Sequence, residues 1–306
     1  MTINNYDDAI KSIKDALFFL EKQNENMQKT TVVSQYSKSQ ESEFNKLKEF
    51  LESPNWPEAV PDYLICKTTD EKDKIDRAHG IIDMSLYAIS DSSKGEDFNI
   101  KNKMFLDFGC GEGHTSIVTT EMGAKSFGFD IEKQGSLIWE TENENGFLTT
   151  NWDKIKEKGT FDFVLIYDVL DHCKDPISVL AKIKEVCSSS TRIFCRCHPW
   201  TGPHAGHYYQ KINKAYIHLV FKEDEIKSLG LEPAFSQKIY FPINETSRWI
   251  KEGGFKIIDQ STITVEISDF FEKNEIIKNR LTENYNGEFP KWQMSQSFND
   301  YVFSVF

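Results

Sequence analysis

The hydrophobic pattern of the first hundred residues is helical. Apolar residues recur there at intervals of three and four, which is the spacing of one face of an α-helix. Three segments carry this pattern, centred on Ile10–Leu20, Phe44–Leu51 and Thr69–Leu86, and polar stretches separate them. The pattern therefore predicts a helical N-terminal extension over residues 1–100.

The pattern changes at Lys103, where short apolar runs begin to alternate with helical segments. The predicted strands are Met104–Leu106, Lys125–Phe129, Gly146–Thr150, Phe161–Tyr167, Arg192–Cys197, Phe255–Ile258 and Tyr301–Phe306. The predicted helices between them are His114–Met122, Pro176–Cys187 and Asn244–Glu252. Apolar strands that alternate with helices are typical of a parallel sheet covered on both faces. We therefore expect an α/β domain over residues 101–306, a Rossmann-like three-layer sandwich with a seven-stranded, mostly parallel sheet.

Composition narrows the range of partners. The chain has 36 Lys and Arg against 48 Asp and Glu, which gives a net charge of −12. An acidic surface gains little from the phosphates of nucleic acid or from an anionic membrane. The chain contains no run of eighteen apolar residues, its first residues do not resemble a secretory signal, and its six cysteines do not form a disulfide framework. These features predict a cytoplasmic protein with reduced thiols that binds neither nucleic acid nor membrane.

A glycine-rich loop stands between the first strand and the first helix of this domain. Gly109, Gly111 and Gly113 alternate with other residues there. Glycines at such a turn let the backbone approach a ligand closely, and the following helix N-terminus presents free N–H groups. A dinucleotide site would have glycine in place of His114. The spacing therefore disfavours NAD.

Two carboxylates indicate the kind of ligand that this loop holds. Asp107 comes two places before the first glycine, where a carboxylate would repel a pyrophosphate but would suit an ammonium group. Asp130 ends the second strand, a position from which a carboxylate accepts hydrogen bonds from ribose hydroxyls. Together with the loop, these residues favour S-adenosylmethionine, which carries both an ammonium group and a ribose.

The stretch from Lys103 to Cys197 resembles the class I S-adenosylmethionine-dependent methyltransferase family. The resemblance implies that the loop holds the methionine part of the cofactor, that Asp130 holds the ribose and that Ile131 packs on the adenine. It places one of Asn151, Trp152 and Asp153 at the adenine amine and does not choose among them. The residues assigned to the cofactor are Asp107, Gly109, Cys110, Gly111, Gly113, His114, Asp130, Ile131, Asn151, Trp152 and Asp168.

The segment that follows the fourth strand indicates the class of acceptor. From Tyr167 to Pro176 it resembles the family variant with a strand-end acid, then Leu, an acid and His, and then Asp-Pro opening a helix. In the family this variant is common among enzymes that act on small molecules. The Asp/Asn-Pro-Pro-aromatic segment of amino-methyltransferases acting on DNA and RNA is absent. The resemblance therefore implies a small-molecule acceptor.

Histidines concentrate beside the expected methyl-transfer position. His172 follows the fourth strand, and His198, His204 and His207 open a long insertion at about residues 198–244. Ligands of open α/β sheets bind at the carboxyl ends of the strands, so these side chains are candidates for orienting or deprotonating the acceptor. The alternative is that they are hydrogen-bonded structurally within a packed loop. With Cys197 they match no standard ligand spacing, so we expect no metal.

The sequence thus predicts an S-adenosylmethionine-dependent methyltransferase that methylates oxygen or nitrogen of a small molecule with the help of a histidine. Two alternatives stay open at this point. One is a methyltransferase that acts on a protein or nucleic acid, and the other is a non-catalytic S-adenosylmethionine-binding or scaffold protein. The N-terminal helices are expected to cap the pocket, to bind a partner or to form a homodimer.

Overall fold

The structure is a computed structural model, and it describes residues 38–60, 70–92, 98–134, 145–232, 245–266, 270–284 and 294–306. The chain divides into two compact units, Met1–Lys46 and Leu47–Phe306. Of the first unit the structure describes only the beginning of helix α2, Lys38–Glu52. The helix predicted around Ile10–Leu20 lies outside the described residues. Everything below concerns the second unit.

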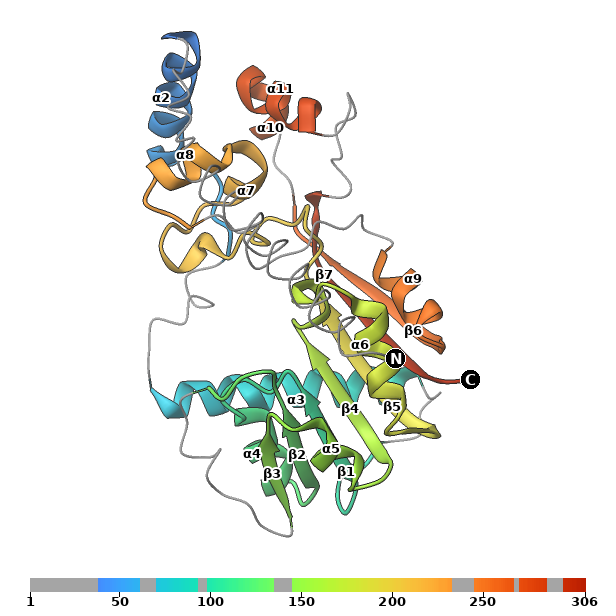
Figure 1. The fold of residues 1–306 in the computed structure, drawn as a ribbon. Helices are drawn as coiled ribbons and strands as arrows, with labels where there is room; N and C mark the ends of the chain where they lie inside the picture. The colour runs from blue at the N-terminus through green and yellow to red at the C-terminus, as the bar shows by residue number, and fades with distance from the viewer. Residues whose placement is uncertain are drawn as a thin grey trace, which may run out of the picture. The chain divides into compact units, whose positions relative to one another are not determined.

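Seven strands form one sheet, as predicted (Figure 1). Its strands are β1 (Met104–Phe108), β2 (Lys125–Phe129), β3 (Gly146–Thr149), β4 (Phe161–Tyr167), β5 (Cys187–Cys197), β6 (Phe255–Thr264) and β7 (Gln296–Val305). Their order is β3-β2-β1-β4-β5-β7-β6. The first five pair in parallel, whereas β7 runs antiparallel to both β5 and β6. The predicted mostly parallel sheet is confirmed.

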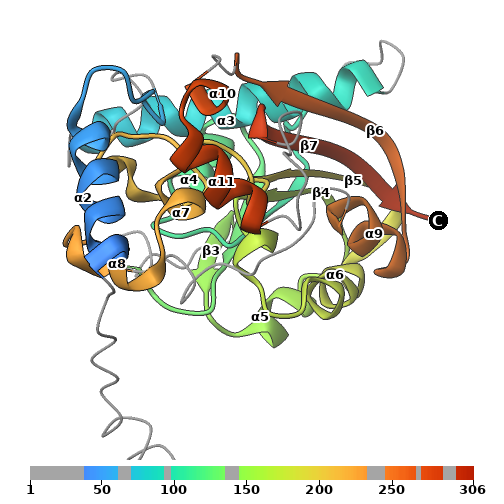
Figure 2. The ribbon, with the colours of Figure 1, turned by 90° about the horizontal axis from the view of Figure 1, so that it is seen from above.

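Helices cover both faces of this sheet (Figure 2). On one face lie α3 (Glu71–Ser92) and α4 (His114–Glu121), and on the other lie α5 (Trp152–Lys156), α6 (Pro176–Lys184) and α9 (Glu245–Glu252). Strand β4 is apolar on both sides because it lies between the two cores. Phe163 and Leu165 pack with α3, while Val164 and Ile166 pack with α6 and α9. The predicted three-layer sandwich is therefore confirmed.

Several elements differ in length from the prediction. The helix expected to reach Cys187 ends at Lys184, and β5 begins at Cys187. Strand β6 continues to Thr264 although its residues after Ile258 are exposed and mostly polar. Its hydrogen bonds with β7 keep it extended, and an exposed edge strand shows little of the hydrophobic alternation that predicts strands.

The described part of the insertion, residues 198–232, is packed and largely buried. It contains η4 (Tyr208–Gln210), α7 (Ile217–Val220) and α8 (Glu223–Ser228). Lys214 Nζ donates to the carbonyl oxygens of Ser53 and Trp56, at 3.0 and 3.3 Å. A buried ion pair joins Glu225 to Arg280 of α11 (Glu275–Asn284), which follows α10 (Phe270–Lys273). These contacts hold the insertion as part of the domain, beyond the end of β5.

Among the helices of the described residues, none has the length and apolar character needed to cross a membrane.

Candidate active site

The loop between β1 and α4 depends on its glycines. Gly109 has φ +81°, and a Cβ there would lie 2.3 Å from Cγ2 of Val169. Gly113 has φ +87° and precedes α4 as its N-cap. The N–H groups of Gly109 and Cys110 both donate to the carbonyl oxygen of Phe129, at 2.7 and 3.1 Å. The two hydrogen bonds hold the loop against the end of β2. The positive φ values, and the close approach of Val169 to Gly109, explain why glycine is needed.

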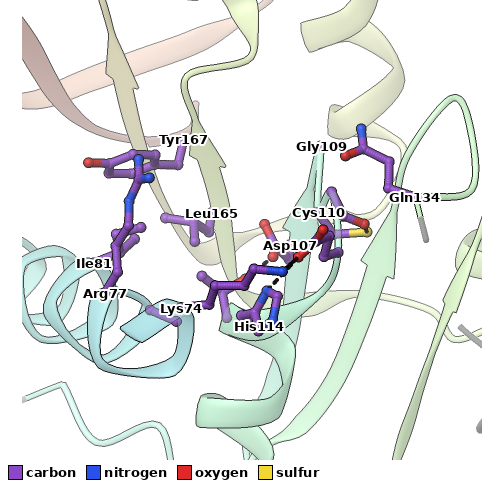
Figure 3. Close-up of a pocket in the computed structure, with 14 residues that line it drawn as sticks. Lys74, Arg77, Ile81, Asp107, Gly109, Cys110, His114, Gln134, Leu165 and Tyr167 are labelled. Carbon is purple, nitrogen blue, oxygen red and sulfur yellow. Dashed lines mark hydrogen bonds and ion pairs between the residues drawn. The ribbon is translucent and has the colours of Figure 1, made fainter. Parts of the chain in front are cut away.

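A cavity of about 480 Å³ opens beside this loop (Figure 3). The predicted cofactor residues that line it are Asp107, Gly109, Cys110, Gly111 and His114. Its opposite wall comes from α3 and from the end of β4. The residues there, none of which was predicted to bind the cofactor, are Lys74, Arg77, Ile81, Leu165 and Tyr167. We call this space the loop cavity.

Charges of opposite sign face each other across the loop cavity. Burial raises the pKa of Asp107 to about 7, a hydrogen bond from the Thr115 hydroxyl lowers it, and the charge of Asp130 raises it. In Figure 3, Lys74 extends toward the loop and Arg77 toward Tyr167. The lining holds the carboxyl groups of Asp107 and Glu112 and the cations of Lys74 and Arg77. Since Lys74 pairs with Glu112 at 2.6 Å, Asp107 and Arg77 remain as the groups complementary to the two ends of an amino-acid zwitterion.

Helix α3 is joined to the loop by two ion pairs. Glu71 Oε2 lies 2.8 Å from His114 Nε2, and Lys74 Nζ lies 2.6 Å from Glu112 Oε2. The hydrogen bond with His114 lowers the pKa of Glu71, and the one with Glu112 raises the pKa of Lys74. His114 thus contacts α3 as well as lining the loop cavity.

Asp130 accepts hydrogen bonds from the glycine loop and from the residue that follows it. Its Oδ2 accepts a hydrogen bond from the Gly111 N–H at 2.8 Å, and its Oδ1 accepts one from Ile131 N–H at 2.7 Å. Ile131 is 87% exposed. Neither Asp130 nor Ile131 lines the loop cavity, and their assignment to the ribose and the adenine stays a prediction.

The residues after β3 have local structural contacts. Asn151 is the N-cap of α5, and its Oδ1 accepts from the Asp153 N–H at 3.0 Å. Trp152 is buried among Phe108 and Phe129, with ring centroids 5.8 and 5.1 Å away. Neither Asn151 nor Trp152 lines the loop cavity. Their assignment to the cofactor stays a prediction.

The four candidate histidines come together, in two pairs. The inner pair is buried: His198 Nε2 lies 3.1 Å from Asp168 Oδ1, and its Nδ1 lies 2.9 Å from His204 Nε2. The ring of Phe298 packs on both, with centroids 4.5 Å from His198 and 5.1 Å from His204. Phe298 was not predicted, because it lies on β7, a hundred residues further along the chain.

The outer pair, His172 and His207, is exposed. Their rings lie 5.3 Å apart, and the His207 ring lies 5.6 Å from that of His198. His207 and Asp168 both have φ +56°, which is rare for residues other than glycine. Such backbone conformations concentrate at functional sites. We call the four residues His172, His198, His204 and His207 the histidine cluster.

Similarity to known proteins identifies the family of this domain. The family model described as "Methyltransferase domain" matches residues 88–260, which is more than half of the chain. The chain belongs to this methyltransferase family. The membership confirms the class I S-adenosylmethionine-dependent methyltransferase family that the sequence predicted.

Curated relatives share this domain at low identity. The ubiquinone biosynthesis O-methyltransferase of Pseudoalteromonas translucida is 21% identical over 163 residues, covering 51% of this chain and 64% of the relative. That of Colwellia psychrerythraea is 24% identical over 168 residues, covering 52% and 63%. The matched part of this chain thus spans slightly less than two thirds of these relatives.

Solved structures match this chain at low identity and with low TM-scores. The plantazolicin methyltransferase BamL, in complex with a triazolic desmethylPZN analogue and SAH, is 15% identical with a TM-score of 0.42; the match covers 78% of this chain and 92% of that one. The magnesium protoporphyrin IX methyltransferase from Synechocystis PCC 6803 with bound SAM is 12% identical with a TM-score of 0.42, covering 86% and 97%.

Proposed function

We propose that this chain transfers the methyl group of S-adenosylmethionine to a hydroxyl or amine of a small-molecule acceptor. The observation that carries the proposal is the pairing of charges across the loop cavity. Asp107 would bind the ammonium of the cofactor's methionine part and Arg77 its carboxylate, while Lys74 stays paired with Glu112 on the same wall. A cavity lined by both signs suits this zwitterion better than it suits a pyrophosphate.

The other proposed cofactor contacts come from residues at the ends of successive strands. The loop glycines bring backbone close to the methionine part, and Asp130 offers lone pairs to the ribose hydroxyls beside its bonds to the loop. Ile131 would provide an apolar surface for the adenine. Asn151 or Trp152 provides the contact at the adenine edge, and Asp168 stands at the end of β4, where the methyl group leaves.

The histidine cluster is the proposed acceptor side of the site. The cofactor supplies a methyl group that is already activated, so the protein has to align the acceptor, exclude water and remove a proton. The exposed pair, His172 and His207, can meet an acceptor, and the buried pair, His198 and His204, supports it from behind. The proposed reaction is therefore methyl transfer with the acceptor's proton removed by the histidine cluster.

Two observations support a small molecule as the acceptor. The net charge of −12 disfavours nucleic acid, and the curated relatives are named as O-methyltransferases of ubiquinone biosynthesis. For this chain, the cytoplasmic location and the homodimer formed through the N-terminal helices stay predictions.

The test is transfer of labelled methyl from S-adenosylmethionine to cell extract separated into small-molecule, protein and nucleic-acid fractions. The proposal predicts label in the small-molecule fraction. Label confined to protein or nucleic acid would identify a macromolecular acceptor instead. Tight cofactor binding without transfer to any fraction would support a non-catalytic binding protein.

A further inference from the structure

Three side chains at the edge of the histidine cluster combine the donor types of a metal site. Asp171, His172 and His207 each offer one ligand atom, and these atoms all lie within 4.8 Å of one another. Asp171 is buried, while His172 and His207 are exposed. Within this group, Asp171 Oδ2 and His172 Nε2 are 3.7 Å apart. The group is thus anchored on one side and open to solvent on the other.

The spacing suits a small divalent ion. Zinc binds imidazole nitrogen and carboxylate oxygen at about 2.1 Å, so two tetrahedral ligands on one ion lie roughly 3.4 Å apart. Asp171 Oδ2 and His172 Nε2, at 3.7 Å, are already near this value, and all three ligand atoms lie within 4.8 Å of one another. Two imidazoles with one carboxylate are typical of sites for zinc and neighbouring transition metals that keep a position open for a ligand.

The backbone and the neighbouring rings hold this group in place. Asp171 and His172 belong to the short helix η3, Leu170–His172. His207 adopts its left-handed backbone at a turn in which its N–H donates to the carbonyl oxygen of His204 at 2.9 Å. The ring of His207 also packs against His198, which Asp168 and His204 fix on either side. Such outer contacts orient ligands in metal sites.

We propose that Asp171, His172 and His207 bind one divalent transition-metal ion, and that the open position of this ion receives a hydroxyl oxygen of the acceptor. This inference rests on the proposed function and deepens it, because it selects an oxygen acceptor over an amine. With His172 and His207 engaged as ligands, the ion rather than an imidazole would lower the pKa of the bound hydroxyl, whose proton leaves to water. The O–CH₃ bond then forms as the S–CH₃ bond of the cofactor breaks, and the sulfonium becomes a neutral thioether.

A second group of acidic residues and a histidine among the described residues is already paired with a lysine. Glu71, Glu112 and His114 also lie within ligand distance of one another. Lys74 Nζ, however, lies 2.6 Å from the Glu112 carboxylate and 3.4 Å from that of Glu71. A resident cation of this kind repels a metal ion, so we assign the site to the first group and use the second as a control.

The experiment measures metal binding rather than turnover. The full chain is stripped with chelator and titrated with Co²⁺, with the visible absorption of the bound ion as the signal, followed by displacement with Zn²⁺. We expect one ion per chain. His172→Ala and His207→Ala should each weaken binding by at least about tenfold, and Asp171→Asn should do the same if it folds. His79→Ala on α3, which removes a histidine away from the group, should bind as the unchanged protein does.

Three outcomes would overturn the proposal: no bound ion at about 100 µM free Co²⁺ or Zn²⁺, where a site of ordinary affinity would be filled; binding that both histidine variants retain; or binding lost in His114→Ala instead. Binding of S-adenosylhomocysteine to the stripped protein separates this failure from failure of the proposed function. A stripped protein that binds the cofactor product and still transfers methyl at the full rate retains the function without the metal.

Discussion

Asp168 and His198 lie 3.1 Å apart, from carboxylate oxygen to Nε2, and this contact joins the end of β4 to the first residue of the insertion. Asp168 stands at the cofactor end of the sheet, whereas His198 leads into the segment with His204 and His207. The contact therefore couples the methyl-donor side of the proposed site to its acceptor side.

The raised pKa of Asp107 makes cofactor binding depend on pH. With a pKa of about 7, the carboxyl is mostly protonated at pH 6 and mostly ionised at pH 8. The cofactor's ammonium binds the ionised form, so affinity for S-adenosylhomocysteine should rise with pH by up to roughly tenfold per unit below about 7, then level off. Calorimetric titration between pH 5.5 and 8.5 measures this.

Asp107→Asn is the matched control for that profile. It keeps the size of the side chain but cannot ionise, so binding should be weaker and independent of pH over this range. A variant that keeps the same pH profile as the unchanged protein would assign the titration to another group.

Removing the Arg77 cation of α3 should weaken only the amino-acid end of the cofactor. We expect Arg77→Ala to lower the affinity for S-adenosylhomocysteine by roughly tenfold, the size of a charge-assisted contact. The variant should bind 5′-methylthioadenosine, which lacks the amino-acid part, as before. Lys72→Ala changes an exposed lysine of the same helix that does not line the cavity, and it serves as the control. Equal losses for both ligands would contradict this assignment.

The glycine loop was predictable from sequence because its signal is local. Asp107, Gly109 and Asp130 are recognised by their place at strand ends, and the structure puts them together. Lys74 and Arg77 carried no such signal, because they lie in a charged turn of α3 whose position over the loop depends on packing far along the chain.

The arrangement of the histidines was likewise only partly predictable from the sequence. Their place at the carboxyl end of the sheet followed from topology, but spacing along the chain did not show that His172 meets His207, nor that Asp171 completes a group with them. The support of the buried pair by Phe298 depends on β7 pairing with β5, a contact between distant segments.

Gly109→Ala should damage both folding and cofactor binding. The added Cβ meets the stiff, branched side chain of Val169 at 2.3 Å and also forces a strained φ. We expect a loss of about 2–4 kcal/mol in the free energy of unfolding, from strain and overpacking together. Gly159→Ala is the control: its φ is +88° but nothing lies within 4 Å, so it should cost only the strain, about 1–2 kcal/mol. Denaturant unfolding compares the two, and equal losses would contradict the close packing at Gly109.

Phe298→Ala should impair catalysis without weakening the cofactor. Removing the ring frees His198 and His204 to reorient, so kcat should fall by about tenfold or more while the Kd for S-adenosylhomocysteine stays within a factor of about two. Phe298→Tyr keeps the ring and should restore most of the rate. A parallel loss of cofactor affinity would show that the ring supports the loop cavity rather than the histidine cluster.

The measurement that tests the account most directly is calorimetric titration of the full chain with S-adenosylhomocysteine at pH 8. The account predicts one site per chain, with a Kd in the micromolar range, and at least about tenfold weaker binding to Asp107→Asn. Absence of binding to the unchanged protein at several hundred micromolar ligand, roughly a hundredfold above such a Kd, would contradict the assignment of the loop cavity to this cofactor.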